Sequence, residues 1–440
     1  MTDPVTPADQ IEPAGKPRLR RAFAGGRRGA APALSLVGLL VVGLLTAQLY
    51  MNWTPTLSTS EEATPTPTPV PVPVASGQTP TPAPTGTLVT NPAIAVPGML
   101  VYAKSGVLWV QSGTTAHQLT ESVNGSQASQ PAFSPDGQWI YYVDTRITTG
   151  QWYDPDSGGA ITGYSLTYPV LCRVHPDGTG KKDVLSSLIR QGSLRTFFWI
   201  MEPSISPNGS TAAVASDGPT VPTVQDVMIH YVNLTTGKLG PALPLHDNPL
   251  LGLSDPAFSP DGGSLAYTME SVSHSYGSPS IWIYRGGVAH ELAGGYRAAS
   301  WSPDGKYIAA TKVVGNTLNV AVLDATTGKQ VAQVTTDGAS WAPVWSPDGD
   351  KLVYMHLTGA IVDLNMVYIS DAAGNFTFRI EPHLTDYSGL DGQSTAAWYI
   401  PGYGSAPSPT ATAAPSGSAA APSPSVSGLP SALAPTATSQ

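Results

Sequence analysis

Residues 256–268 read Pro-Ala-Phe-Ser-Pro-Asp-Gly-Gly-Ser-Leu-Ala-Tyr-Thr: a short apolar strand, a turn and a second, alternating strand. Proline fixes φ at the second turn position, Asp bonds its own backbone, and glycine accepts the left-handed conformation that ends the turn. The chain contains five such turns, at 134–137, 206–209, 259–262, 302–305 and 346–349, with Asn for Asp in the second. A repeat period of roughly 40–50 residues indicates an array of small sheets.

Each unit continues beyond the turn into two further strands. In the third unit these are residues 280–284 and 289–292, separated by Gly286-Gly287. Alternation at period two and a high content of Val, Ile, Tyr and Trp are typical of strands. We therefore predict four antiparallel strands per unit, a to d in chain order.

The two ends of the repeat region are incomplete in complementary ways. Residues 99–120 supply b, c and d strands without an a strand, and residues 395–401 supply an a strand with nothing after it. Joining them gives six sheets of four strands and leaves no open sheet edge. The predicted fold is all-β, a six-bladed β-propeller over 97–403 that is closed by its C-terminal strand.

An uncharged apolar segment precedes the propeller. Residues 31–53 begin with twenty mostly apolar positions, enough for a helix of about 30 Å, and the basic tail 1–30 comes before them. By the positive-inside rule, we predict a single-pass bacterial cytoplasmic membrane protein with its N-terminus inside and its propeller outside. A cleavable signal peptide is the alternative, and Arg20-Arg21 also resembles a twin-arginine export signal.

Two biased segments flank the propeller. Residues 54–96 are rich in Pro and Thr, and residues 404–440 are almost wholly Ala, Pro, Ser, Thr and Gly. Such compositions bury too little apolar surface to offset the entropy of ordering, so we predict a disordered stalk and a disordered tail. The formal net charge is −9, and no Lys/Arg cluster follows residue 53, which argues against nucleic acid as a partner.

The repeat unit resembles a known family. Its Ser-Pro-Asp-Gly turn, followed in the first unit by Asp177-Gly178-Thr179-Gly180, resembles the propeller repeat of TolB and of related WD-like bacterial propellers, including those of prolyl-oligopeptidase-type enzymes. The resemblance implies the propeller fold and, for TolB, partners in the cell envelope. This chain departs from the family in having no α/β domain before the propeller and no Gly-x-Ser-x-Gly nucleophile motif.

The predicted connections place the candidate binding site. The b–c and d–a connections are long (145–166, 185–202, 271–279, 357–365 and 381–394) and must crowd one face of the disc. Long loops on a rigid scaffold often carry binding residues, and aromatic side chains suit recognition. The candidate ligand- or partner-binding residues are Trp152, Tyr153, Asp154, Asp156, Arg195, Trp199 and Glu202. The alternative for Phe197, Phe198 and Trp199 is that they fill space between blades.

The sequence shows no catalytic motif. The eight histidines are scattered, the calcium-like start at 154–158 contains Pro155 and has Ser165 at its twelfth position, and Cys172 is the only cysteine. We predict no catalytic residues, no metal, no cofactor and no enzyme activity. The expected function is a monomeric binding module for an envelope protein, peptide or glycan.

Two other functions stay open at this point. One is an enzyme, a hydrolase or lyase, that acts on an envelope polymer at the mouth of the propeller channel, and the other is a purely structural role. Paired buried acids in the channel with separated pKa values would favour the enzyme, and a neutral lining would favour binding.

Overall fold

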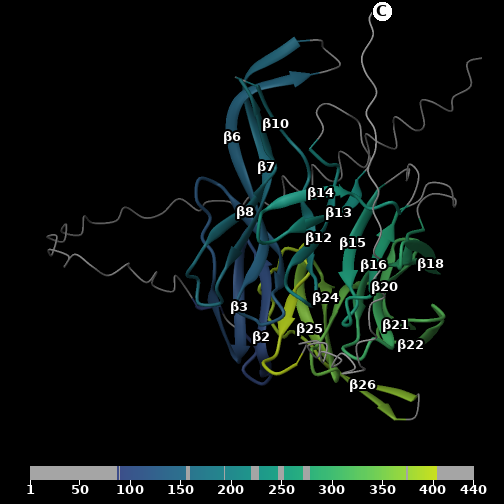
Figure 1. Ribbon diagram of the computed structural model, residues 1–440. Coiled ribbons are helices and arrows are strands. Elements are labelled where there is room, and N and C mark those ends of the chain that lie inside the picture. Colours follow the sequence, from purple (N-terminus) through teal and green to yellow (C-terminus); the bar gives the residue numbers. More distant parts are fainter. Residues whose placement is uncertain are drawn as a thin grey trace, which may run out of the picture. The chain divides into compact units, whose positions relative to one another are not determined.

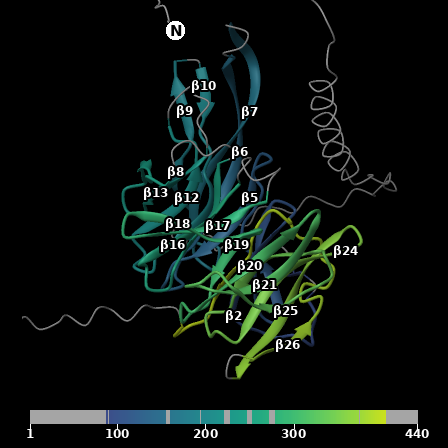
Figure 2. The ribbon, with the colours of Figure 1, turned by 90° about the vertical axis from the view of Figure 1, so that its right-hand side faces the viewer.

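The computed structural model describes residues 87–88, 90–154, 159–192, 194–219, 227–245, 252–270, 278–372 and 375–403. These residues belong to one unit, Thr79–Gln440, and form six sheets (Figures 1 and 2). None of them forms a helix that is long and apolar enough to cross a membrane. The predicted helix at 31–53, most of the predicted stalk and the tail 404–440 lie outside the described residues.

The six sheets are the blades of the propeller, and in each the strands run in order from the innermost outward. Blade 1 contains β27 (Ala397–Tyr399), β2 (Val96–Lys104), β3 (Val107–Gly113), β4 (Thr115–Gln118) and β1 (Thr87–Leu88). Blade 2 contains β5 (Gln127–Phe133), β6 (Ile140–Asp154), β7 (Gly159–Val174) and β8 (Lys182–Ser186), with β10 (Leu194–Phe197) and β9 (Leu188–Gln191) added beside β6. Blade 3 contains β11 (Met201–Ile205), β12 (Thr211–Ser216), β13 (Met228–Asn233) and β14 (Lys238–Ala242).

The remaining blades repeat the same order. Blade 4 contains β15 (Leu253–Phe258), β16 (Ser264–Met269), β17 (Ser280–Arg285) and β18 (Val288–Gly294). Blade 5 contains β19 (Tyr296–Trp301), β20 (Tyr307–Val314), β21 (Thr317–Asp324) and β22 (Gln330–Gln333). Blade 6 contains β23 (Ser340–Trp345), β24 (Lys351–Thr358), β25 (Ile361–Ala372) and β26 (Asn375–Glu381).

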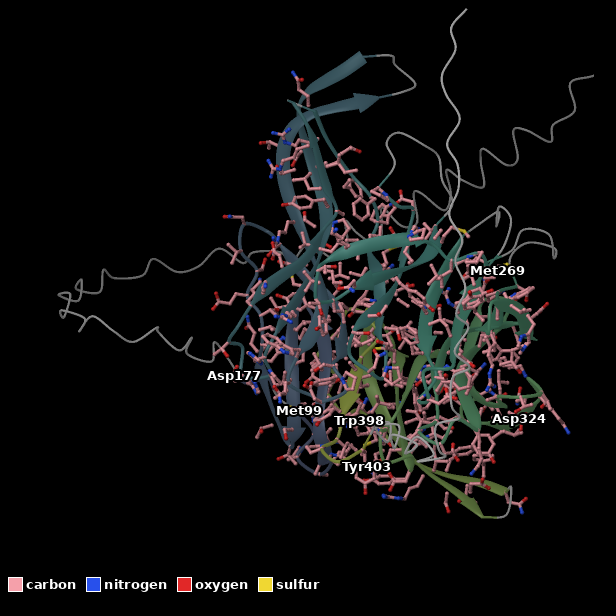
Figure 3. All side chains as sticks on the ribbon, viewed as in Figure 1. Met99, Asp177, Met269, Asp324, Trp398 and Tyr403 are labelled. Carbon is pink, nitrogen blue, oxygen red and sulfur yellow. The ribbon has the colours of Figure 1, made fainter. Side chains whose placement is uncertain are left out.

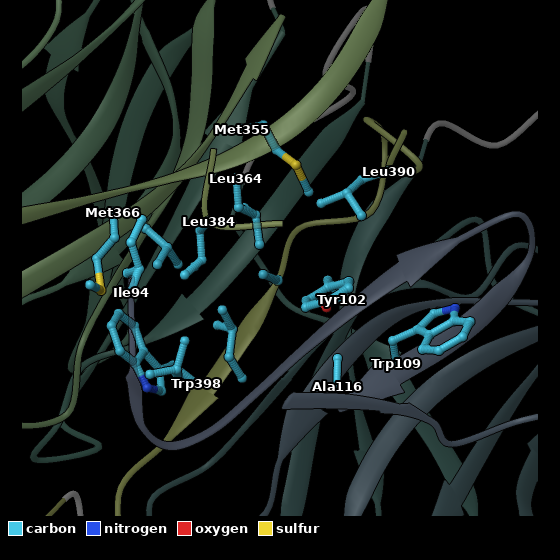
Figure 4. Close-up of a cluster of buried hydrophobic side chains, with 14 of the residues drawn as sticks. Ile94, Tyr102, Trp109, Ala116, Met355, Leu364, Met366, Leu384, Leu390 and Trp398 are labelled. Carbon is cyan, nitrogen blue, oxygen red and sulfur yellow. The ribbon is translucent and has the colours of Figure 1, made fainter. Parts of the chain in front are cut away.

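The ring is closed by the last strand. Each inner strand contacts the next, and β27 contacts both β23 and β5. β27 pairs with β2 in antiparallel register, with Leu100 opposite Trp398. Trp398 is 7% exposed, lies in the apolar cluster between blades 6 and 1 (Figure 4), and donates its indole N–H to the Pro97 carbonyl at 2.8 Å. The predicted six-bladed propeller with C-terminal strand closure is confirmed.

The repeated turn is held by side-chain hydrogen bonds. In blade 4 the Ser259 hydroxyl donates to Asp261 Oδ1 at 2.5 Å and accepts from the Ser264 amide at 2.9 Å. Gly262, at φ 68°, donates to the Ser259 carbonyl at 2.8 Å. The other four turns form the same bonds, with Asn208 Oδ1 in place of the Asp oxygen in blade 3. Because the side chains satisfy the turn's backbone, the turn stays tight at each a–b junction.

The a–b and c–d turns lie at one end of the propeller, which we name the turn face. Asp177 and Asp324, from c–d turns of blades 2 and 5, lie toward the same end as Tyr403, whereas Met269 at the end of β16 lies toward the other end (Figure 3). We name that other end the loop face.

Two predicted loops of the loop face are strands instead. β6 and β7 extend over 145–154 and 159–166 as the arms of a long hairpin, and β9 and β10 occupy 188–191 and 194–197 within 185–202. β10 joins this hairpin in parallel register, with Leu194 opposite Gln151, and the assembly projects beyond the other blades (Figures 1 and 2). The Gly, Asp and Ser residues of this region are typical of a loop, but β-branched residues such as Ile147 and Thr148 favour strands. We name this region, which contains β6 from residue 145, β7 up to residue 166, β9 and β10, the blade 2 extension.

The folded region begins before residue 97, so the predicted end of the stalk at residue 96 is wrong. Thr87 and Leu88 pair with β4, the Asn91 amide donates to the Leu384 carbonyl at 3.3 Å, and Ile94 is 4% exposed. Ile94 packs in the cluster that closes the ring (Figure 4). Its burial explains why a Pro-containing segment is nevertheless ordered here.

Candidate functional site: the central channel and the turn face

All six innermost strands line a cavity of about 220 Å³ on the propeller axis. Its walls include Gln130, Glu202, Asp255, Ala298 and Pro343 from blades 2 to 6, and Ala396 from the closing strand. Propeller topology therefore brings together residues from Gln130 to Ala396, which no local motif connects.

Five inner strands carry the same backbone irregularity in the channel wall. Each contains a β-bulge at which a non-glycine residue has positive φ. These residues are Gln130 (52°), Glu202 (54°), Asp255 (50°), Ala298 (53°) and Ala342 (48°). Such a conformation costs roughly 1–2 kcal/mol for a residue with a Cβ, so five copies indicate that the surroundings hold it in place.

Side chains from the preceding blade supply that support. The Glu202 amide donates to Gln130 Oε1 at 2.9 Å, and the Asp255 amide donates to Glu202 Oε2 at 2.6 Å. The Ala298 amide donates to Thr268 Oγ1 at 3.1 Å, and that hydroxyl donates to Asp255 Oδ2 at 2.9 Å. Ser394 and Thr311 cap the remaining two bulge amides in the same way. A relay of hydrogen bonds thus connects neighbouring blades around the axis.

An acidic group interrupts this otherwise neutral relay. Glu202 and Asp255 lie side by side, and Arg297 approaches Asp255 at 3.8 Å and Glu270 at 3.4 Å. Removal from water, with the charge of Asp255 as a second cause, raises the pKa of Glu202 to about 7. The Asp255 amide and Arg297 act in the opposite direction. A carboxyl group with this pKa is able to exchange a proton near neutral pH.

A larger cavity lies at the turn face. It has a volume of about 850 Å³, and we name it the basin. Its wall combines the last residues of inner strands with the prolines of four turns: Phe133, Ile205, Phe258, Trp301 and Trp345, and Pro135, Pro207, Pro260 and Pro303. Pro347 of the fifth turn also lines it, and Arg285, His290 and Asp304 add charged or titratable groups. The residue types that make the repeated turn therefore also make a mostly apolar, concave surface.

The structure separates the residues that the sequence grouped as candidates. Trp152, Tyr153 and Asp154 lie on β6 in the blade 2 extension, with side chains outside the described part of the chain, and Asp156 lies outside it altogether. Arg195 lies on β10 and donates to the Gly192 carbonyl at 2.7 Å. Their role in binding stays a prediction.

Trp199 and Glu202 follow the extension in sequence, but Trp199 is exposed to solvent and Glu202 lies in the channel wall. Trp199 is 46% exposed, its amide donates to Asp217 Oδ1 at 2.7 Å, and Phe197 meets its ring edge-on at 5.0 Å. Its neighbour Phe198 is 5% exposed and packs between blades 2 and 3. The space-filling alternative therefore fits Phe198 and does not fit Trp199. Glu202 lies in the channel wall.

Sequence reasoning missed Gln130 and Asp255 as channel residues, and Arg297 as the ion-pair partner of Asp255. The sequence did contain a signal for these channel positions, because four of the five bulge residues precede a proline: Gln130, Glu202, Asp255 and Ala342. A proline three residues before a Ser-Pro-Asp/Asn-Gly turn marks a place where an inner strand departs from regular pairing. Among the described residues, no group of three or more His, Cys, Asp or Glu is placed to hold a metal ion.

No family model matches the chain. A curated relative, the uncharacterized peptidase YuxL of Bacillus subtilis, is 33% identical over 116 residues, which cover 24% of this chain and 17% of the relative. The solved structure of TolB from Acinetobacter baumannii is 18% identical and covers 68% of this chain and 66% of TolB, at a TM-score of 0.46. The chain is a six-bladed β-propeller. The topology of its blades carries that assignment.

The prediction that the chain is not an enzyme needs correction. It depended on the lack of a catalytic motif, whereas the curated relative is named a peptidase. Similar structures also include oligogalacturonate lyase from Vibrio parahaemolyticus (10% identical, covering 67% of this chain and 93% of the lyase, TM-score 0.39) and a puromycin-hydrolyzing peptidase from Mycobacterium tuberculosis (13% identical, 64% and 42%, TM-score 0.40). Because the 33% identical relative is named a peptidase, the missing motif does not exclude activity.

Proposed function

We propose that the propeller is the binding domain of a cell-envelope protein and that the basin receives an extended segment of a protein partner. One observation carries the proposal: a concave surface of about 850 Å³ formed by aromatic rings and prolines from several blades. Pockets lined by aromatic and apolar side chains with a few polar groups are typical binding sites. Arg285, His290 and Asp304 supply such polar groups in its lining.

The basin favours an extended peptide over a folded surface. Its aromatic members lie at the ends of the inner strands, within the ring of turns, so a partner must enter the ring to reach them. Trp301 and Trp345 already donate their indole N–H groups to the Ala257 and Gly349 carbonyls, so they present ring surface. An extended chain offers apolar side chains to such a surface with little loss of folded structure.

A photo-crosslinking residue at position 326 tests this site. Thr326 is exposed and lines the basin, whereas Thr317 of the same blade is exposed and follows a b–c turn at the loop face, which makes it a matched control. We expect crosslinking in intact cells to capture one protein through position 326 and not through 317. Mass spectrometry should place the crosslink in a single short segment of that protein. Equal capture from both positions, or none from 326, would contradict the proposal.

We also propose the location that the sequence predicts: anchored in the cytoplasmic membrane through 31–53, with the propeller outside. The apolar segment, the preceding basic tail and the Pro/Thr-rich stalk support it. The chain should remain with membranes after an alkaline wash, and protease added to spheroplasts should degrade the propeller. Protection of the propeller from protease would refute this orientation.

A second candidate function is chemistry on an envelope polymer, and the acid pair in the channel favours it. The raised pKa of Glu202 beside Asp255 meets the requirement of a general acid. Turnover of peptidoglycan fragments that is lost in Glu202→Gln and retained in Glu291→Gln, an exposed position on β18, would support this function. Equal turnover in both variants would place the activity elsewhere.

A further inference from the structure

A second turn-face cavity lies between blades 2 and 3, next to the basin. It has a volume of about 620 Å³ and is lined by Trp139, Tyr141 and Arg173 of blade 2 and by the turns of blade 3 that include Asn208 and Thr235. Pro135 and Pro207 line both this cavity and the basin. We name it the Arg173 pocket.

Arg173 breaks the pattern of the six blades. On the innermost strand of blade 2, Ala132 pairs with Tyr141 of the second strand, and Tyr141 pairs in turn with Arg173 of the third strand. The residues with the same pairing in the other blades are Val110, Tyr231, Ile283, Val322 and Met366. All of these are apolar or aromatic, and four are 4% exposed or less. A charged side chain at this position is not needed for the propeller to form.

The guanidinium of Arg173 has no anionic partner within the part of the chain that the structure describes. It lies 4.1 Å from the centre of the Trp139 ring, and its Nε is buried without a hydrogen-bond acceptor. A buried N–H that lacks an acceptor is destabilising by about 1–3 kcal/mol, and such groups often mark a missing ligand or ion. Lys182 lies opposite Arg173 on β8 and also lines the pocket.

The acids of the pocket are already occupied. Asp183 accepts two bonds of 2.7 Å from Arg146, and Asp136 Oδ1 accepts from Ser134 and Gln138 within its turn. Arg173 and Lys182 are therefore the uncommitted charges of the pocket, in a chain whose formal net charge is −9. A planar guanidinium is suited to two parallel hydrogen bonds with a carboxylate.

We propose that the Arg173 pocket binds a compact ligand through a single carboxylate. Asp136 and Asp183 line the same pocket as Arg173, so a singly charged anion would be repelled less by these acids than a doubly charged phosphate. Trp139 is already stacked by His175 at 3.6 Å and by Arg173, so recognition depends on the carboxylate more than on ring stacking. The proposal stands apart from the proposed binding of a protein in the basin.

The test compares Arg173→Met with Arg190→Met in the full chain. Met is the residue that blade 6 holds at this position, so Arg173→Met keeps the packing type and removes only the charge. Arg190 is exposed on β9, outside the pocket lining, and its replacement changes the net charge equally. Circular dichroism melting confirms that each variant is folded before binding is measured.

Saturation-transfer NMR with the purified full chain measures binding of two probes, acetyl-dialanine and glucuronate, each beside its neutral amide. The two carboxylates distinguish a peptide terminus from an acidic sugar as the source of the group. We expect at least one to bind with a dissociation constant of about 1 mM or below, its amide not to bind, and Arg173→Met to weaken binding about tenfold or more. Arg190→Met should leave the binding unchanged.

Three results would overturn the proposal. The first is that neither carboxylate binds the wild-type chain at up to about 10 mM. The second is equal binding of a carboxylate and its amide, or equal binding by the Arg173→Met and Arg190→Met variants. The third is that inorganic phosphate binds more tightly than both carboxylates in an Arg173-dependent manner.

Discussion

Blades 2 and 5 share one frame and differ in what is added to it. The two middle strands of blade 5 are eight residues long and are joined by a short turn. Val322, which pairs with Ala309 on the neighbouring strand, is fully buried there. Blade 2 has middle strands of 15 and 16 residues, two added strands, and Arg173 at the matching position. The repeat therefore builds the ring, and departures from the repeat mark places with another role.

Placing the blade 2 residue in blade 5 is the strongest test of this comparison. Val322→Arg puts a charge at a site with 0% exposure, between Ala309 and other apolar residues. An unpaired buried charge should destabilise the fold by about 3–5 kcal/mol, measured by urea denaturation with circular dichroism. Val331→Arg, at a position that is 38% exposed, is the matched control and should change stability by less than about 0.5 kcal/mol. A Val322→Arg variant as stable as wild type would show that blade 2 is not special at this position.

The shared frame depends on closure of the ring, which a single tryptophan tests. Trp398→Ala removes a side chain that is 7% exposed together with its bond to the Pro97 carbonyl. We expect a loss of about 3 kcal/mol or more in the free energy of unfolding. Trp199→Ala, at a 46% exposed position, should cost much less. Similar losses for the two variants would contradict the closing role of β27.

Much of this frame was predictable from sequence because it is repeated. Five turns with the same chemistry indicate five of the six blades, and the unpaired ends near Leu100 and Trp398 indicate the sixth blade and the closure. The blade 2 extension was not predictable as strands, because it occurs once and its composition resembles a loop. The bulge at Glu202 carried a local signal in the following Pro203. Its neighbour Asp255 comes from another blade, and only the ring places the two together.

The channel also departs from the repeat, because Glu202 and Asp255 place two acids side by side, and their effect on stability depends on pH. The pKa of Glu202 is raised to about 7, so its ionised form is disfavoured in the folded chain. Its contribution to stability is therefore full below its ordinary pKa of about 4.3 and is lost as the pH rises toward 7. Glu202→Gln keeps an oxygen to accept from the Asp255 amide and should remove this decline. Urea midpoints from pH 4 to pH 8 measure it, with Glu291→Gln expected to follow wild type. A wild-type stability that does not fall between these values would contradict the assignment.

The Ser-Pro-Asp/Asn-Gly turns test whether the chemistry that five of the six blades share is structural. Asp261→Ala removes the acceptor of the Ser259 hydroxyl and of the Gly263 amide and should cost about 1–2 kcal/mol. Asp261→Asn should cost less, because Asn208 forms the same bonds in blade 3. These bonds hold the pKa of Asp261 below its usual range, so the contribution of Asp261 is lost as the pH falls below about 4. Thermal melts at pH 7 and pH 3 should show that the Asn variant lacks this acid sensitivity. A larger loss for Asn than for Ala would contradict this account of the turn.

The smallest change in stability is expected when Arg173 of blade 2 is replaced by an apolar residue, which is the reverse of Val322→Arg in blade 5. Arg173→Met restores the residue type of the repeat and removes an N–H that has no acceptor. The loss of the contact between Arg173 and Trp139 opposes this gain. The free energy of unfolding should therefore increase, but by less than about 1 kcal/mol. Arg146→Met provides the contrast, because Arg146 neutralises Asp144 and Asp183, and its loss should destabilise the same blade. If Arg173→Met is as costly as Arg146→Met, Arg173 is a structural residue of blade 2, and its difference from Val322 has no functional meaning.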